Sequence, residues 1–227
     1  MPENTALLRL MSWLSPSFPV GAYTYSHGLE TAVEDGDIKD RASAGIWITD
    51  MVAQGAGRMD AVLMIHAWRA VVNEDDDLLV DVAEMAEALS ATSELALETE
   101  SQGAAFLKAV DSAWPTEATD LLRVRHDGAI AYPVAVGVTA AGHGVPLTEA
   151  AVAYLHAYAA NLISATVRLV PLGQTDGLLL TSALEPLIPK VAATALVTPL
   201  DGISTMTFMA DLKSMQHETQ RTRLFRS

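Results

Sequence analysis

The sequence predicts an all-α fold: a single-domain, irregular bundle of roughly ten helices around a central buried helix. Apolar residues recur at steps of three and four along most of the 227-residue chain. Runs of strand length with alternating polarity are missing, and no segment repeats at a fixed period. Because no low-complexity linker divides the chain, we expect one domain over residues 1–227.

The central helix is expected from Leu147 to about Leu169. Thr148 and Glu149 are typical of a helix start, because the hydroxyl can accept a first-turn N–H and the carboxylate lies at the positive end of the dipole. Small residues on a second face would let another helix approach closely. The apolar stripe comprises Val152, Leu155, Ala159, Leu162, Thr166 and Leu169. A helix that is apolar nearly all round belongs in the middle of a bundle.

The end of this helix carries Arg168, and a polar loop is expected after it. Pro171 cannot continue the helix, and glycines bracket the loop Gln174–Asp176. Arg168 has two interpretations: it forms a structural ion pair with Asp176, or it joins Gln174 and Asp176 in a surface that meets a partner. The spacing alone favours the structural ion pair.

Periodicity, caps and chain breakers define the remaining helices in order. Two prolines and a glycine within Ser15–Ala22 stop the first helix, and acidic residues turn the chain at Glu74–Asp77. The expected helices are one capped by Asn4 or Thr5 with Leu7, Leu8, Met11 and Leu14 at helical spacing, then Tyr23–Val33, Asp40–Gln54, Met59–Val72, one beyond Asp77, one from Thr92 or Ser93 to about Val110, one ending near His126, then Pro133–Ala141, the central helix, Gly177–Leu184, Pro189–Leu196 and Met206–Gln216.

The composition narrows the classes of function. The absence of cysteine excludes disulfides, thiolate nucleophiles and cysteine metal sites. A formal net charge of -14 argues against nucleic-acid binding, which needs clustered Lys and Arg. Proline, glycine or polar residues interrupt the apolar stretches, so we expect no membrane span. The N-terminus lacks the pattern of a signal peptide, and a cytoplasmic location is expected.

No catalytic set can be assembled from the residues. A phosphate-binding loop needs a Gly-Lys pair, and the sequence has none. His217 begins a pattern similar to a helical zinc motif, but Arg221 stands where the second histidine should return. The acidic run from Asp75 to Asp81 leaves open a helical metal-dependent lyase or transferase, although a solvated turn is the simpler interpretation. We therefore expect an interaction protein, with no cofactor and no metal site.

Three stretches together resemble the signatures of one family. They are Phe18–Glu30 (FPVGAYTYSHGLE), Ala160–Gly177 with its RLVPLGQTDG ending, and His217–Gln220 (HETQ) followed by Arg223–Ser227 (RLFRS). In this order they resemble the N-terminal, central and C-terminal signatures of the urease accessory protein F (UreF) family. The resemblance spans nearly the whole chain.

The resemblance implies an all-α, homodimeric chaperone that forms a complex with the scaffold accessory protein UreD (also called UreH) and the GTPase UreG. That complex would deliver nickel to apo-urease, and nucleotide hydrolysis would be the GTPase's work. A soluble nickel-storage protein is a weaker alternative, because the sequence has only 6 histidines.

The expected partner-binding residues lie within the three signatures. They are Tyr23, Tyr25, His27, Glu30, Arg168, Gln174, Asp176, His217, Glu218, Arg223, Phe225 and Arg226. Given the resemblance, Arg168 is expected both to hold its loop and to meet partners. The C-terminal tail, about residues 214–227, has little apolar surface, so we expect it to be mobile in the free protein and to order on the scaffold protein.

Overall fold

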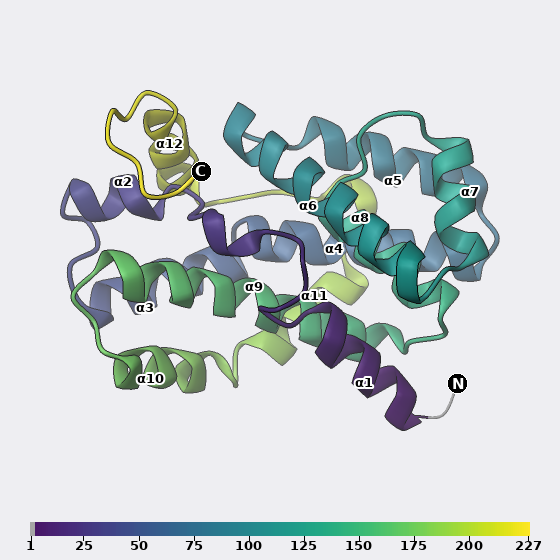
Figure 1. Cartoon of the computed structure of the whole chain (residues 1–227), viewed down its shortest axis with the longest axis horizontal. Coiled ribbons are helices and arrows are strands. Elements are labelled where there is room, and N and C mark those ends of the chain that lie inside the picture. The colour runs from purple at the N-terminus through teal and green to yellow at the C-terminus, as the bar shows by residue number, and fades with distance from the viewer. Residues whose placement is uncertain (1–2) are drawn as a thin grey trace.

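The computed structural model describes residues 3–227, which form helices and, within that range, no β-strand (Figure 1). The α-helices of the first half are α1 (Glu3–Trp13), α2 (Leu29–Glu34), α3 (Arg41–Ala53), α4 (Ala56–Val72), α5 (Asp76–Ala88) and α6 (Ser93–Ala113). Those of the second half are α7 (Glu117–Arg125), α8 (Tyr132–Gly142), α9 (Leu147–Leu169), α10 (Gln174–Leu184), α11 (Ile188–Val197) and α12 (Phe208–His217). Two 3-10 helices, η1 (Ala22–Thr24) and η2 (Leu200–Gly202), complete the described chain. The predicted all-α bundle is confirmed.

Helix α9 is the predicted central helix. Leu155, Leu162 and Thr166 are fully buried, and α3, α4, α10 and α11 all pack against it (Figure 1). Its composition and length would also permit a membrane span, but 56% of that apolar window is buried inside the protein. The predicted cap is wrong, because Pro146 precedes the first helical residue and no side chain caps the helix. The fixed φ of the proline starts this helix instead.

Helices α4 and α8 pack unusually closely. A Cβ atom at Gly137 would overlap the carbonyl oxygen of Met64, so only glycine permits this approach. Beyond it, α5 packs on α4 and α7 packs on α8, and these helices enclose a second apolar cluster that includes Leu79, Val82 and Leu122. The larger cluster surrounds α9.

The N-terminal elements differ from the prediction in two ways. Helix α1 buries Leu10 and Trp13 and exposes the predicted stripe of Leu7, Leu8 and Met11. The expected helix Tyr23–Val33 is divided into η1 and α2, because the backbone between them takes positive φ at His27 (54°) and Gly28 (76°). These left-handed residues turn the chain so that α2 packs against α12.

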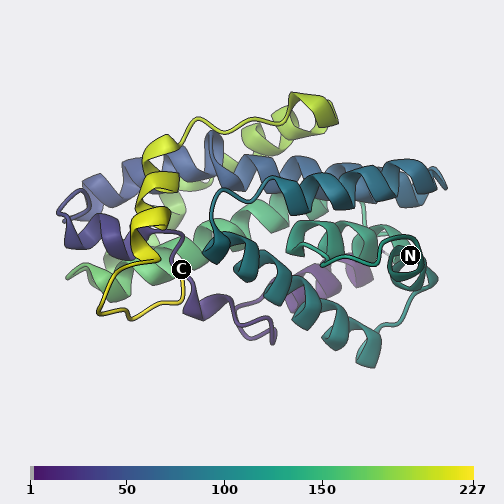
Figure 2. The ribbon, with the colours of Figure 1, turned by 90° about the horizontal axis from the view of Figure 1, so that it is seen from above.

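After α12 the chain turns back and runs beside α2 to end near η1, as Figure 2 shows from above. We call residues 218–227 the C-terminal strap. Its backbone pairs with the N-terminal segment: Arg226 N–H donates to the Thr24 carbonyl at 2.8 Å, and Ser26 N–H donates to the Ser227 carbonyl at 2.8 Å. Segments some two hundred residues apart in sequence are therefore joined directly.

Candidate functional site

The carboxylate of Glu30 is the centre of the contact between the strap and the N-terminal segment. It accepts the backbone N–H groups of Leu224 at 2.7 Å and Phe225 at 2.9 Å. The Nε2 atom of His217 lies 3.3 Å from the same carboxylate. Because Glu30 is only 9% exposed, these hydrogen bonds replace the water that a carboxylate would otherwise require.

A second carboxylate, Glu94 at the start of α6, extends this network. Its Oε2 lies 2.7 Å from Nδ1 of His217, and its Oε1 accepts from the guanidinium of Arg223. Each ring nitrogen of the fully buried His217 thus faces a carboxylate. Nearby, Glu218 accepts from the Ser93 hydroxyl at 2.6 Å, and this hydrogen bond holds the pKa of Glu218 below its usual value.

Arg168 joins the end of α9 to the same region. Its guanidinium lies 3.7 Å from the ring centroid of Tyr23 and 4.3 Å from that of Phe225. These are cation–π distances, and they link all three of the segments that were singled out in the sequence. The predicted ion pair with Asp176 is wrong, because Asp176 pairs instead with Arg41 at 3.2 Å.

The predicted polar loop Gln174–Asp176 is also wrong, since these residues form the first turn of α10. Asp176 accepts the N–H of Gly173 at 3.2 Å, which satisfies a backbone donor at the start of the helix. Gln174 is exposed at this helix start. Neither residue shares a recorded hydrogen bond or ion pair with the strap.

The expected mobility of the tail is wrong in the free protein. Phe225 is 4% exposed and Ser227 is fully buried, so the strap has an apolar anchor and a hydrogen-bonded end. Tyr25, Glu30 and His217 are buried as well, and in this conformation their side chains are not a surface for partners. Tyr23, Arg223 and Arg226 are exposed, and Glu218 is partly exposed.

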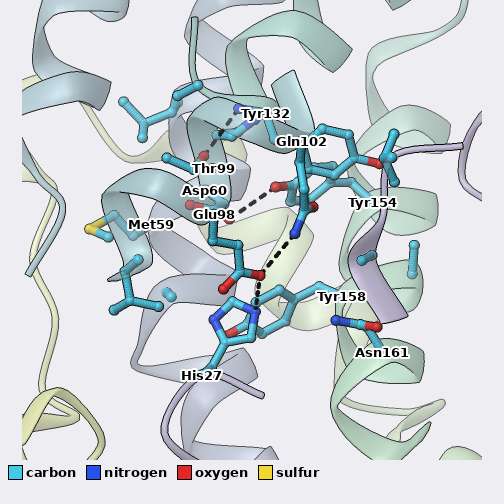
Figure 3. Close-up of a pocket in the computed structure, with 18 of the residues that line it drawn as sticks. His27, Met59, Asp60, Glu98, Thr99, Gln102, Tyr132, Tyr154, Tyr158 and Asn161 are labelled. Atoms are coloured by element: carbon cyan, nitrogen blue, oxygen red, sulfur yellow. Dashed lines mark hydrogen bonds and ion pairs between the residues drawn. The ribbon is translucent and has the colours of Figure 1, made fainter. Parts of the chain in front are cut away.

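A cavity of about 310 Å³ lies next to this region, between α4, α6, α8 and α9 (Figure 3). His27, also expected at the surface, points into it and pairs with Glu98 at 3.0 Å. Burial alone would lower the pKa of His27, but the carboxylate of Glu98 outweighs that effect and the pKa is raised. Glu98 also accepts from Gln102 at 2.9 Å and from the Ser227 hydroxyl at 2.7 Å.

Asp60 is the third acid at the cavity wall. Burial raises its pKa to about 7, although the Tyr154 hydroxyl donates to it at 2.9 Å and stabilises the charged form. Within residues 3–227, no three His, Asp or Glu side chains converge closely enough to hold a metal ion. At the acidic run, Asp75 caps α5 by accepting Leu78 N–H at 3.0 Å, and Asp76 pairs with Arg125.

Sequence reasoning missed Glu94, Glu98 and Asp60. All three lie on helices at positions where an acidic residue is ordinarily solvated, and nothing in the local spacing distinguishes them. The available signal was the context of Asp60, which interrupts an otherwise apolar helix face formed by Ala56, Leu63 and Met64, whereas Glu98 has the polar Glu94, Ser101 and Gln102 one turn away. Such an interruption predicts a buried polar partner, but it does not say which residue supplies it.

The fold and these contacts define an all-α helical-bundle protein whose C-terminal strap is held against its N-terminal segment. The family model described as UreF matches residues 38–185. The urease accessory protein UreF of Rhodopseudomonas palustris strain TIE-1 is 51% identical over 225 residues, which cover 99% of this chain and 94% of that protein. The UreF of Xanthobacter autotrophicus is also 51% identical, over 98% of this chain and 91% of that protein. The chain therefore belongs to the UreF family of urease accessory proteins.

Proposed function

We propose that this protein is a non-catalytic urease maturation chaperone of the cytoplasm. In this role it joins the scaffold protein UreD/UreH and the GTPase UreG in a complex that delivers nickel to apo-urease, and it acts as a homodimer. The names of the relatives support the urease role. The sequence contains no Gly-Lys pair of a phosphate-binding loop, which is consistent with hydrolysis by the partner.

The observation that carries the proposal is the reversed polarity of helix α12. Its buried face is polar: Lys213 pairs with Asp35 at 2.6 Å, and Ser214 shares a hydrogen bond of 2.9 Å with Thr92. Its outward face is apolar, with Phe208 73% exposed and Met209 52% exposed. A helix that turns its aromatic and methionine side chains to solvent is suited to bind a partner.

The strap continues this outward face. Leu224 is exposed next to the buried Phe225. The exposed guanidinium of Arg226 can donate paired hydrogen bonds to a carboxylate, and Arg223 keeps further donors beside its ion pair with Glu94. We assign the scaffold UreD/UreH to this combined surface of α12 and strap. The buried signature residues Glu30 and His217 then serve the interface indirectly, because they fix the strap that presents it.

The test is co-expression with UreD/UreH and UreG, followed by affinity capture and a mass measurement on the eluted complex. The double variant Phe208→Ser, Met209→Ser is expected to fold normally and to lose the complex. Val197→Ser on α11 removes a similarly exposed apolar side chain and is expected to retain it. Recovery of the intact complex from the α12 variant at normal yield would refute the assignment.

The proposed homodimer needs a separate measurement. Light scattering on the isolated protein should give twice the chain mass of 24.1 kDa. A monomer mass at micromolar concentration would contradict the dimer and would leave the partner surface on α12 unaffected.

A further inference from the structure

The cavity beside His27 has an aromatic wall (Figure 3). Four of the 5 tyrosines of the chain line it: Tyr23, Tyr132, Tyr154 and Tyr158. The ring centroids of Tyr132 and Tyr154 lie 5.7 Å apart, and the Tyr158 ring lies 5.3 Å from the imidazole of His27. Arg168 already lies over the Tyr23 ring, and the negative π-faces of the other three tyrosines favour a cation in the space between them.

The charges of the lining agree with this preference. Asp60, Glu98 and Asp211 line the cavity, and within residues 3–227 no Lys or Arg does. The lining also contains His27, but its imidazole is already paired with Glu98, so a phosphate, a carboxylate or a nucleotide would meet acidic groups without a free permanent cation to bind it. The same acids are too far apart to converge on a metal ion. The lining therefore favours an organic cation, whose charge is spread over a larger volume.

Two residues that line the cavity each have a buried polar atom without a hydrogen-bond partner. The hydroxyl of Tyr158, a residue that is only 8% exposed, has no hydrogen bond, and neither has Nδ1 of His27. Buried polar groups are satisfied in most proteins, and a group without a partner lowers stability. The Tyr158 hydroxyl is covered in this conformation, and a ligand that carries a hydroxyl as well as a positive charge would supply its missing partner once the ring shifts toward the cavity.

We propose that this cavity binds a small organic ammonium cation that carries a hydroxyl group. The ammonium group lies among the tyrosine rings and the carboxylates of Asp60 and Glu98, and the hydroxyl meets Tyr158. Tyr23, which is 63% exposed, places one end of the cavity at the surface and gives the ligand access. Asp211 of α12 also lines the cavity, but the partner surface is formed by the outward face of that helix, and neither proposal depends on the other.

The acids give binding a defined pH dependence. Asp60 is faced by Tyr154 of α9, by Tyr132 of α8, by Glu98 of α6 and by His27, and burial among them raises its pKa to about 7. A cation favours the ionised carboxylate, so binding should release a proton below that pH. Affinity is therefore expected to increase as the pH rises from 6 to 8.

The test is isothermal titration calorimetry with choline as the probe. The matched controls are 3,3-dimethyl-1-butanol, which has the same shape without the charge, and nickel chloride. Choline is expected to bind at least about tenfold more tightly than either control, and more tightly at pH 8 than at pH 6. Equal binding of the neutral analogue, tighter binding of nickel, or no choline binding up to about 10 mM would each overturn the proposal.

Two variants locate the site. Asp60→Asn should weaken choline binding about tenfold at pH 8 and abolish its pH dependence, whereas Asp77→Asn on the solvated face of α5 should change neither. Tyr158→Phe keeps the ring and removes an unpaired hydroxyl, so the protein should remain folded. It should weaken choline severalfold and leave tetramethylammonium unchanged. Unchanged choline binding by both cavity variants would place the ligand elsewhere and overturn the proposal.

Discussion

The guanidinium of Arg168 lies 4.3 Å from the ring centroid of Phe225, although the two residues belong to the end of the central helix and to the strap. The same guanidinium lies 3.7 Å from the Tyr23 ring. One cation thus holds two aromatic rings from opposite ends of the sequence. Its Nε donates to the Ser164 carbonyl at 3.1 Å, which fixes its direction.

This relationship predicts a stability cost at Phe225. Phe225→Ala should lower the free energy of unfolding by about 2–4 kcal/mol, because it removes a buried ring and its contact with Arg168. Leu224→Ala next to it should change stability by less than about 0.5 kcal/mol, since that side chain is 67% exposed. Urea denaturation followed by circular dichroism measures both, and equal small effects would mean that the strap is not anchored by its ring.

Glu30 predicts a local loosening of the strap. Glu30→Ala leaves the N–H groups of Leu224 and Phe225 without their acceptor, and we expect a loss of about 2–3 kcal/mol. The readout is hydrogen exchange at these two amides, which should become much faster. Glu34→Ala, an exposed acid on the same helix, is the control. Unchanged protection in the Glu30 variant would contradict the hydrogen-bond assignment.

Gly28 and Gly36 form a matched pair with φ of +76° and +82°. Alanine is strained by about 1 kcal/mol at either position. Only at Gly28 does the new Cβ meet a neighbour, 2.7 Å from the backbone nitrogen of Ser214 on α12. Gly28→Ala should therefore lower the melting temperature more than Gly36→Ala, and it should also weaken capture of the scaffold protein. Equal melting temperatures would show that α2 and α12 can move apart without cost.

The raised pKa of Asp60 predicts the direction of a pH effect on stability. Its pKa is about 7 in the folded protein, against 3.8 for an unperturbed Asp. The folded state therefore binds the proton more tightly, and stability falls as the pH rises from about 4 to about 7. Because Asp60 lies at the cavity wall, we expect this loss in the free energy of unfolding to be about 2–4 kcal/mol, less than the full pKa shift would give.

Asp60→Asn should remove that loss and be more stable than the parent at pH 8. His27 contributes in the same direction over a higher window, because its raised pKa stabilises the fold below about 6.5 and is lost as the pH passes the folded value. Denaturant titrations of the parent protein at pH 5 and pH 8 measure the combined effect of Asp60 and His27 on the free energy of unfolding. The same titrations of Asp60→Asn give the contribution of Asp60 by difference. A parent protein that becomes more stable over this range would contradict the assigned sign.

The helices were predictable because the information that defines them is local. The stripe of α9 and the cap at Thr92, which accepts Leu95 N–H at 3.1 Å, follow from residues within one or two turns. The end of the first helix before the two prolines and the glycine of Ser15–Ala22 was likewise predictable, and Gly21 takes a φ of 77° there. Such features depend only on residues that are close together in the sequence, so the sequence alone is enough to predict them.

The pairings across the bundle could not be predicted in the same way. Asp176 lies eight residues from Arg168, yet its partner is Arg41, 135 positions away. The strap has little apolar surface of its own, and its position depends on one carboxylate 195 residues earlier. The composition predicted a mobile tail, because it reflects only how much apolar surface the segment itself has. It does not show that acceptors elsewhere in the chain bind the N–H groups of the segment.

The distance between Glu30 and the strap also affects the order of events during synthesis. The α2 segment leaves the ribosome long before residues 217–225 exist, so a growing chain carries Glu30 and Glu94 without the donors that later satisfy them. A chain that stops short of the strap would keep two poorly compensated acids, Glu30 of α2 and Glu94 of α6, on either side of His217. Only a chain synthesised through the strap completes this part of the fold, and nascent or truncated copies would remain distinguishable to the cell's quality control.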